Sequence, residues 1–116
     1  MKKIAILTCL NACRCCTGAA CMDAWNNRKI GFAMYRDQEV MLCAFLHCNG
    51  CGSDPETDPG MIEKLDRLQS EGVTVVHTGI CTVIDKEHRT YCPSIVKIIA
   101  MLRARGIETV YGTHRL

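Results

Sequence analysis

The sequence predicts an α/β fold, a three-layer sandwich built on a small four-stranded parallel sheet. Short apolar runs that are typical of strands alternate along the chain with segments whose apolar residues recur at helical spacing. Strands that are separated by single helices pair in parallel and are joined by right-handed crossovers. The topology is therefore expected to be Rossmann/flavodoxin-like, with ligands bound at the carboxyl edge of the sheet.

The first half of the chain predicts two strands and one crossover helix. Residues 3–8 are rich in Ile and Leu and form a run too short for a stable helix, so they are expected to be a buried strand. A helical stretch opens near Ala20 and continues towards Tyr35, with a break or kink at Gly31. Residues 39–46 form a nearly continuous apolar run, which is typical of a parallel strand covered on both faces.

The second half repeats this pattern with clearer helix boundaries. A helix is expected over residues 59–72, because Asp58 supplies an N-cap, a proline occupies the first helical position and a glycine ends the helix. Residues 73–80 are β-branched and apolar, which indicates a third strand, and a loop of about ten residues follows it. Residues 93–106 carry an apolar stripe at helical spacing and lead into a fourth strand at 108–112.

Composition indicates one soluble domain over residues 1–116. This length corresponds to about one domain, and a hydrophobic content of 48% is enough for a core without disulfide staples. No apolar run approaches the ~20 residues that cross a bilayer, and the N-terminus lacks a signal-peptide pattern. The net charge of +2 arises from interleaved signs, without the basic footprint of a nucleic-acid binder. We therefore expect a cytoplasmic protein whose partners include neither nucleic acid nor membrane.

Ten cysteines in 116 residues are the main functional clue. Clustered cysteines in a reducing cytoplasm are more often metal ligands or redox-active thiols than structural disulfides. The carboxyl ends of parallel strands meet at one edge of the sheet, and most of the cysteines fall at strand ends or in the loops of that edge. The candidate metal ligands are Cys9, Cys16, Cys21, Cys48, Cys51, Cys81, Cys92 and His114.

Several motifs in combination carry a resemblance to a known family: Cys9, Cys16-Thr17-Gly18 with Cys21, Cys48-Asn49-Gly50-Cys51-Gly52, Cys81, Cys92-Pro93 and Gly112-Thr113-His114. Their joint spacing resembles the CGGC domain family over nearly the whole chain. The resemblance implies a site rich in cysteine and histidine that is suggested to bind zinc. It implies no established reaction.

The sequence departs from the family pattern at a few positions. Asn49 stands where the family name has glycine, yet asparagine tolerates a left-handed backbone and both flanking sulfurs remain. Ser94 stands where the family often has histidine, which removes one candidate nitrogen ligand. Cys13 and Cys15 are additions to the family pattern.

The Cys48-x-x-Cys51 spacing fits both a metal half-site and a redox dithiol. A thioredoxin-like dithiol is usually one isolated pair, whereas several further cysteines are expected at the same edge here, which favours metal. Sulfur-rich coordination suits zinc and also an iron-sulfur cluster. Neither carboxylates nor serines form a recognisable catalytic set. The leading hypothesis is a zinc-binding protein; the alternatives are a thiol-redox enzyme or sensor, an iron-sulfur protein, and a purely structural metal site.

Other cysteines and histidines have structural interpretations. Cys43 lies in the middle of the second strand and is expected to be a small buried hydrophobe. His77 lies within the third strand and is expected to be a hydrogen-bonded core histidine, whereas His88 lies in a polar loop. His47 and Cys48 are neighbours in an extended strand, so they are expected to point to opposite faces.

Overall fold

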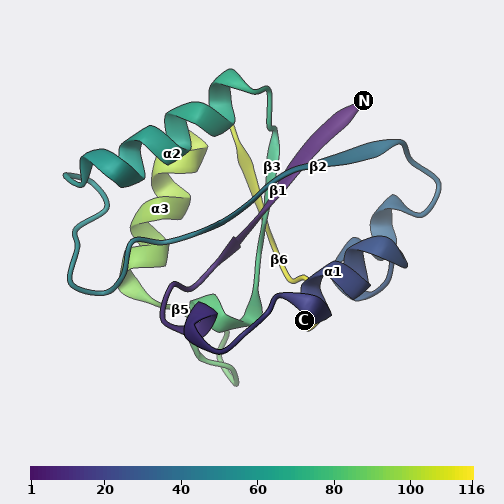
Figure 1. Cartoon of the computed structure of the whole chain (residues 1–116), viewed down its shortest axis with the longest axis horizontal. Helices are drawn as coiled ribbons and strands as arrows, with labels where there is room; N and C mark the ends of the chain where they lie inside the picture. Colours follow the sequence, from purple (N-terminus) through teal and green to yellow (C-terminus); the bar gives the residue numbers. More distant parts are fainter.

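The computed structural model describes all of residues 1–116 and contains the predicted parallel sheet (Figure 1). Every pair of neighbouring strands is parallel. The strands of this sheet, in spatial order, are β2 (Val40–His47), β1 (Lys2–Thr8), β3 (Val75–Thr78) and β6 (Glu108–Tyr111). The predicted α/β fold class is confirmed.

Helices cover both faces of the sheet and complete three layers (Figure 1). One face packs against α2 (Pro59–Ser70) and α3 (Pro93–Ala104) through a cluster of 13 buried residues. The other face packs against α1 (Ala19–Asn26) and the 3₁₀ turn η2 (Ile30–Tyr35) through a cluster of 7 buried residues. None of the helices has the length and apolar character needed to cross a membrane.

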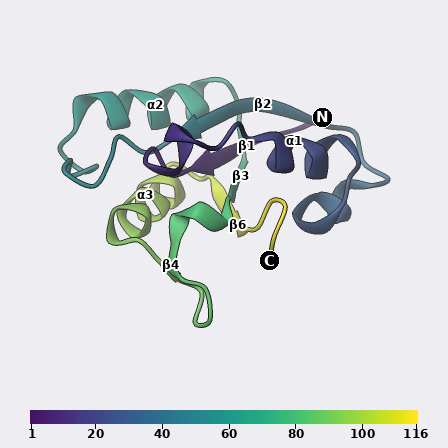
Figure 2. The same ribbon diagram turned by 60° about the horizontal axis from the view of Figure 1, so that its bottom comes forward.

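The shorter elements lie at the carboxyl edge of the sheet and in the loop before α3. Two further 3₁₀ turns follow β1 and β3, and a small antiparallel hairpin projects from the body (Figure 2). These elements are η1 (Ala12–Arg14), η3 (Ile80–Thr82), β4 (Val83–Asp85) and β5 (Thr90–Tyr91). The sequence predicts only a loop where the hairpin lies. The hairpin contains His88, which is exposed, as predicted for a polar segment, and its Nδ1 lies 2.8 Å from Asp85 Oδ2.

The first crossover helix is shorter than predicted, and its break comes before Gly31. Helix α1 ends at Asn26, and Arg28 and Ile30 then take left-handed backbone conformations at φ 50° and φ 56°. The Arg28 guanidinium lies 3.9 Å from the centre of the Trp25 ring and donates to the Trp25 carbonyl oxygen at 2.6 Å. These contacts stabilise a turn that the sequence pattern did not reveal.

Two predictions for β2 are wrong. The strand lies at the edge of the sheet and is only half-covered, and Cys43 is exposed. An edge strand has one strand neighbour and is covered less than a central one, which explains the exposure. A β-bulge also interrupts its pairing: Ile4 pairs with Leu42 and Ala5 pairs with Ala44, so Cys43 is the unpaired extra residue. The apolar run therefore does not indicate burial on both faces.

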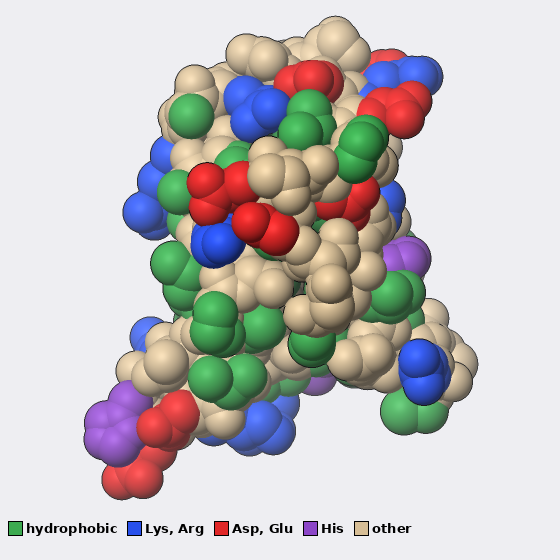
Figure 3. All heavy atoms as spheres, turned by 90° about the vertical axis from the view of Figure 1, so that its left-hand side faces the viewer, with side chains coloured by type: hydrophobic (Ala, Val, Ile, Leu, Met, Phe, Trp, Pro, Cys, Tyr) green, Lys and Arg blue, Asp and Glu red, His purple; other side chains and the backbone are tan.

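Charged side chains on the outer surface are mixed in sign. Figure 3 shows one face of the molecule, on which acidic and basic groups lie side by side among apolar patches. The ion pairs are at the surface, and an example is Arg105 with Asp66 at 2.9 Å. Pairs of this kind contribute only about 0–1 kcal/mol each, so the fold is held mainly by the two apolar clusters.

Candidate metal centre

The segment that leaves β1 donates hydrogen bonds to three cysteine sulfurs from two other parts of the chain, the loop after β2 and the turn after β3. The donors and acceptors are Cys9 N–H to Cys81 Sγ (3.2 Å), Leu10 N–H to Cys48 Sγ (3.4 Å) and the Asn11 side-chain amide to Cys51 Sγ (3.5 Å). Strand β1 lies between β2 and β3, so its exit lies between the loops that follow both neighbours. Hydrogen bonds to sulfur are a common outer contact of metal-bound thiolates.

A cavity of about 460 Å³ opens beside this segment, on the α1 side of the sheet. Its walls come from the loop before α1, from α1 itself, from β2, from η3 and from the C-terminal segment. The sulfur and imidazole groups that line it belong to Cys13, Cys15, Cys16, Cys21, Cys81, His47 and His114. The carboxyl edge of the sheet is thus a thiol-rich site, as the topology predicts.

Cys21 is the most deeply set of these thiols. Its Sγ lies 3.1 Å from Thr113 Oγ1 and 3.4 Å from His114 Nδ1. The C-terminal segment is held there because Gly31 N–H donates to the Thr113 carbonyl oxygen at 2.9 Å. Burial raises the pKa of the Cys21 thiol, and the Thr113 hydrogen bond offsets part of that rise. Cys21 is therefore a neutral thiol near pH 7 in the metal-free chain.

Cys81 lies at the other side of the cavity, in η3 directly after β3. Burial raises the pKa of its thiol, and the hydrogen bond from Cys9 N–H lowers it by less. Cys13 Sγ lies 3.5 Å from Thr8 Oγ1, and Cys16 Sγ accepts a hydrogen bond from Gly18 N–H at 3.4 Å. Thiols from three segments thus face one space.

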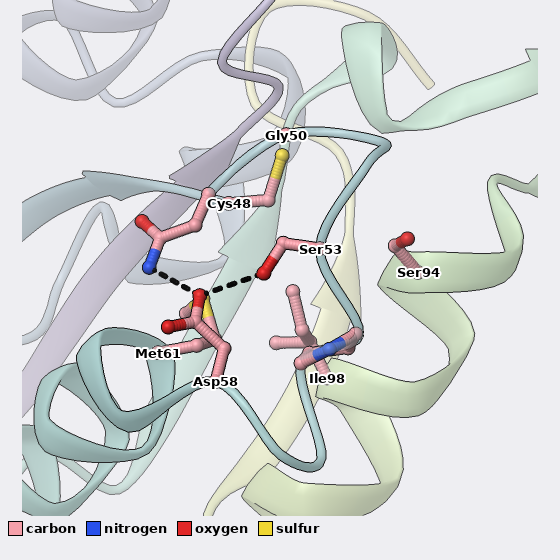
Figure 4. A pocket seen from close by; sticks show the side chains of 9 residues that line it. Cys48, Gly50, Ser53, Asp58, Met61, Ser94 and Ile98 are labelled. Atoms are coloured by element: carbon pink, nitrogen blue, oxygen red, sulfur yellow. Dashed lines mark hydrogen bonds between the residues drawn. The ribbon is translucent and has the colours of Figure 1, made fainter.

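The Cys48 loop lies on the opposite side of the sheet. Cys48 is buried in the cluster formed by α2 and α3, and a shallow hollow there is lined by Met61 and Ile98 (Figure 4). The loop is anchored to Asp58, whose Oδ2 accepts from the Asn49 amide at 2.8 Å and from the Ser53 hydroxyl at 3.0 Å (Figure 4). Both bonds lower the pKa of the Asp58 carboxyl, and the bond from Asn49 has the larger effect.

Asn49 therefore has a structural role that a glycine at this position could not fill. Its side-chain oxygen accepts from Lys64 Nζ at 2.7 Å, while its amide donates to Asp58. Asp58 also caps α2 by accepting from Gly60 N–H at 3.0 Å. The departure from the family motif thus fixes the loop to the start of α2.

The bulge at Cys43 decides which β2 side chains face the cavity. Before the bulge, Leu42 packs on the α1 side of the sheet; after it, Ala44 packs on the α2 and α3 side. Phe45 and His47 consequently line the cavity, and Cys48 points away from it. His47 and Cys48 do face opposite sides, as the sequence predicts for neighbours in a strand.

The structure divides the eight predicted ligands into three groups. Cys16, Cys21, Cys81 and His114 line the cavity. Cys9, Cys48 and Cys51 lie outside it and are linked through hydrogen bonds of the segment after β1, with Cys48 and Cys51 on the α2 and α3 side of the sheet. Cys92 lies apart, at the N-cap of α3 against the larger apolar cluster. The cavity also contains four groups outside the predicted set: Phe45, His47, Cys13 and Cys15. Their orientation depends on the bulge and on η1, for which the sequence carries no clear signal.

The donor chemistry of the cavity fits a soft or borderline metal ion, since sulfur and imidazole are the groups that such ions prefer. No three His, Cys, Asp or Glu side chains are already arranged at metal-holding positions. Cys21 and His114, whose sulfur and nitrogen lie 3.4 Å apart, are the nearest approach to a ligand pair among the predicted residues.

Comparison with known proteins gives one match. The family model described as the CGGC domain matches residues 3–114. No curated protein and no solved structure matches the chain. The match includes every cysteine and histidine of the candidate site.

Proposed function

The chain belongs to the CGGC domain family, and from this premise we propose that it binds zinc through cysteine and histidine side chains at the carboxyl edge of its sheet. The family and the ten cysteines fit a metal-binding role. The observation that carries the proposal is that Cys16, Cys21, Cys81 and His114 line one cavity. Three sulfurs and one imidazole are a ligand set that zinc takes in proteins.

In this proposal the four residues have distinct tasks. Cys21 is a buried thiol and Cys81 a half-buried one, and their protons leave when the ion binds. Cys16 supplies a third, exposed sulfur from the loop before α1, and His114 contributes its imidazole beside Cys21. Thr113 and the Cys9 N–H orient the sulfurs of Cys21 and Cys81 by hydrogen bonds. When bound, zinc would link the three segments that carry these four ligands.

Cys9, Cys48 and Cys51 form the second part of the proposed site. They lie outside the cavity, and the segment after β1 links them to it because its N–H groups donate to the sulfurs of Cys48, Cys51 and Cys81. All ten cysteines are free thiols, and we expect the chain to act as one domain in the reducing cytoplasm, where thiols persist.

An iron-sulfur cluster is the second candidate, and the three N–H to sulfur hydrogen bonds favour it. Bonds of this kind help to set the reduction potential of such clusters. The thiol-redox alternative has less support. A thiol nucleophile acts as thiolate, whereas burial raises the pKa of both Cys21 and Cys81.

The test is elemental analysis for zinc, iron and acid-labile sulfide, together with a visible spectrum, on protein purified without oxygen. We expect about one zinc per chain and no colour. In Cys21→Ser with Cys81→Ser, bound zinc should fall by at least about tenfold, because two ligands are lost. Cys43→Ser is the matched control, since this thiol is exposed on β2 and lies outside the cavity.

Other results of these measurements would favour a different metal group or a different site. Iron with sulfide and a brown spectrum would replace zinc with a cluster. Full zinc in the Cys21 and Cys81 variant would exclude the cavity as the site. A Cys48→Ser with Cys51→Ser variant then measures whether the thiols across the sheet hold the ion instead.

A further inference from the structure

The cavity is much larger than a metal ion needs. A structural zinc site is closed around the ion by its four ligands. The space here is about 460 Å³, within the range of about 300–1,000 Å³ that is typical of small-molecule sites. Thiols line part of it, while Phe45, Ile80 and Ala12 form an apolar part.

Phe45 is the main apolar group at this cavity, and it remains 40% exposed. Its ring lies against Gly18 at the start of α1, so close that a Cβ on that glycine would be 3.2 Å from Phe45 Cζ. The aromatic ring thus bridges β2 and α1 above the cavity. A large ring that is held in place but only partly covered is a suitable surface for another ring.

No Lys, Arg, Asp or Glu side chain lines the cavity. A carboxylate ligand would therefore lose its hydration without gaining a lysine or arginine partner. His47 lines the cavity, and its side chain makes no hydrogen bond with the protein; only its backbone carbonyl is used, by Lys64. An imidazole in this position can exchange one hydrogen bond with a ligand.

From its size, its exposed ring and its lack of Lys, Arg, Asp and Glu side chains, we propose that this cavity binds a small uncharged aromatic molecule with a single hydroxyl group. Its ring packs on Phe45 and Ile80, and its hydroxyl bonds to the His47 imidazole. The proposed metal would share this cavity, but the inference uses other side chains of its wall: Phe45, Ile80 and His47, none of which is a proposed metal ligand. It describes a chamber for an organic ligand beside the thiols.

The probe is 4-methylphenol, added to ¹⁵N-labelled protein as purified while backbone amide shifts are followed. A ligand of this size is expected to bind with a Kd on the order of 1 mM. The shifts should be largest at Gly18, Phe45 and Ile80. The same titration on chelated protein with 4-methylbenzoate, which has the same ring and a carboxylate, should give no saturable shift.

Two variants and one control test the assigned contacts. Phe45→Ala should weaken binding by about fivefold or more, and His47→Leu by about three- to tenfold, through loss of a ring contact and of one hydrogen bond. Val96→Ala is the control, because Val96 lines a second apolar hollow of about 440 Å³ that contains Arg103 and no histidine or cysteine. The amide spectrum of each variant also shows that it is folded.

The inference is overturned if 4-methylphenol gives no saturable shift at several millimolar, or if its shifts centre on the Val96 hollow. Equal binding of 4-methylbenzoate would overturn the argument from charge. Zinc content, measured on the same samples, decides the metal function separately, so failure of one proposal does not count as failure of the other.

Discussion

His77 shows how a single buried side chain can be understood from its hydrogen bonds. It is fully buried in β3, with Nδ1 2.9 Å from the Gly112 carbonyl oxygen and Nε2 2.7 Å from the Tyr35 hydroxyl. A carbonyl only accepts, so Nδ1 carries the proton and Nε2 accepts from Tyr35. The neutral ring therefore satisfies both neighbours, and burial lowers the pKa of His77. The predicted core histidine is confirmed.

This lowered pKa predicts a loss of stability in acid. Because the folded pKa lies below the ordinary value of 6.5, the unfolded chain binds more protons than the folded chain below that pH. The free energy of unfolding should then fall from pH 6.5 towards about pH 5, by up to about 1.4 kcal/mol per pH unit. Of the nearby charges, Glu108 raises this pKa and Lys2 lowers it, both less than burial does.

Urea unfolding of metal-free protein at several pH values measures this slope. His77→Gln should be less stable than wild type but should lose most of the slope, since the group that titrates is gone. His88→Gln is the matched control, because His88 is exposed on the hairpin. An unchanged slope in His77→Gln would assign the acid sensitivity to other groups.

At the same scale, Cys43 shows why burial of one residue is hard to predict. Its neighbours Leu42 and Ala44 are both apolar, and nothing in the local pattern marks the inserted residue of a bulge. His77 was predictable because β3 lies between two other strands and its whole length is covered. Cys43 lies on an edge strand, where the burial of a side chain depends on how far the helices of the adjacent layer extend over it.

At the scale of elements, boundaries set by local chemistry were predictable from sequence. Helix α2 begins at Pro59 after the Asp58 cap, and α3 begins at Pro93, both as predicted. Glycines with positive φ follow both helices, at Gly72 and Gly106. The direction of β2 side chains was not predictable, because all but the last residue of the strand are apolar, and alternation carries no signal in such a run.

The contact between η2 and the C-terminal segment gives a prediction for Gly31. A Cβ at this position would lie 2.6 Å from the Gly112 carbonyl carbon and 2.8 Å from the Thr113 oxygen. Gly31→Ala should therefore push the terminal segment away, at a cost of about 1–3 kcal/mol in unfolding free energy. Because that segment holds His114 beside Cys21, zinc affinity should fall as well.

Thermal unfolding and zinc titration of the Gly31→Ala variant measure both effects. Gly52→Ala is the matched control, since a Cβ there has no neighbour within 4 Å. If the two variants have equal stability, the close approach of η2 to the terminal segment does not contribute to folding. Loss of stability with unchanged zinc affinity would separate His114 from the site.

At the scale of the whole molecule, the strand order explains which part of the site was predictable. Parallel strands bring their carboxyl ends to one edge, so the convergence of Cys9 and Cys81 follows from topology alone. The order β2-β1-β3-β6 makes β1 and β3 neighbours, and Cys9 N–H indeed contacts Cys81 Sγ at 3.2 Å. Topology does not fix the face, and Cys48 lies across the sheet from Cys21 because the bulge intervenes.

The arrangement of the core predicts how the chain responds to metal removal. Clusters of 13 and 7 buried residues hold the two helical layers on the sheet, and of the four proposed cavity ligands only Cys21 belongs to either cluster. The chain should therefore remain folded after chelation, with its far-ultraviolet circular dichroism unchanged at 25 °C. The melting temperature should fall on the order of 10 °C, because a tightly bound ion stabilises only the folded state.

Melting curves of zinc-loaded, chelated and reloaded protein test this prediction. The control is the Cys21→Ser, Cys81→Ser variant, which should bind little zinc and whose melting temperature should not change on addition of chelator. Collapse of the circular dichroism on chelation would mean that the ion is needed for folding, as in small zinc domains. A folded metal-free state instead means that the two apolar clusters hold the sheet and its helices together without the ion. Such a chain can take up and release its metal without unfolding.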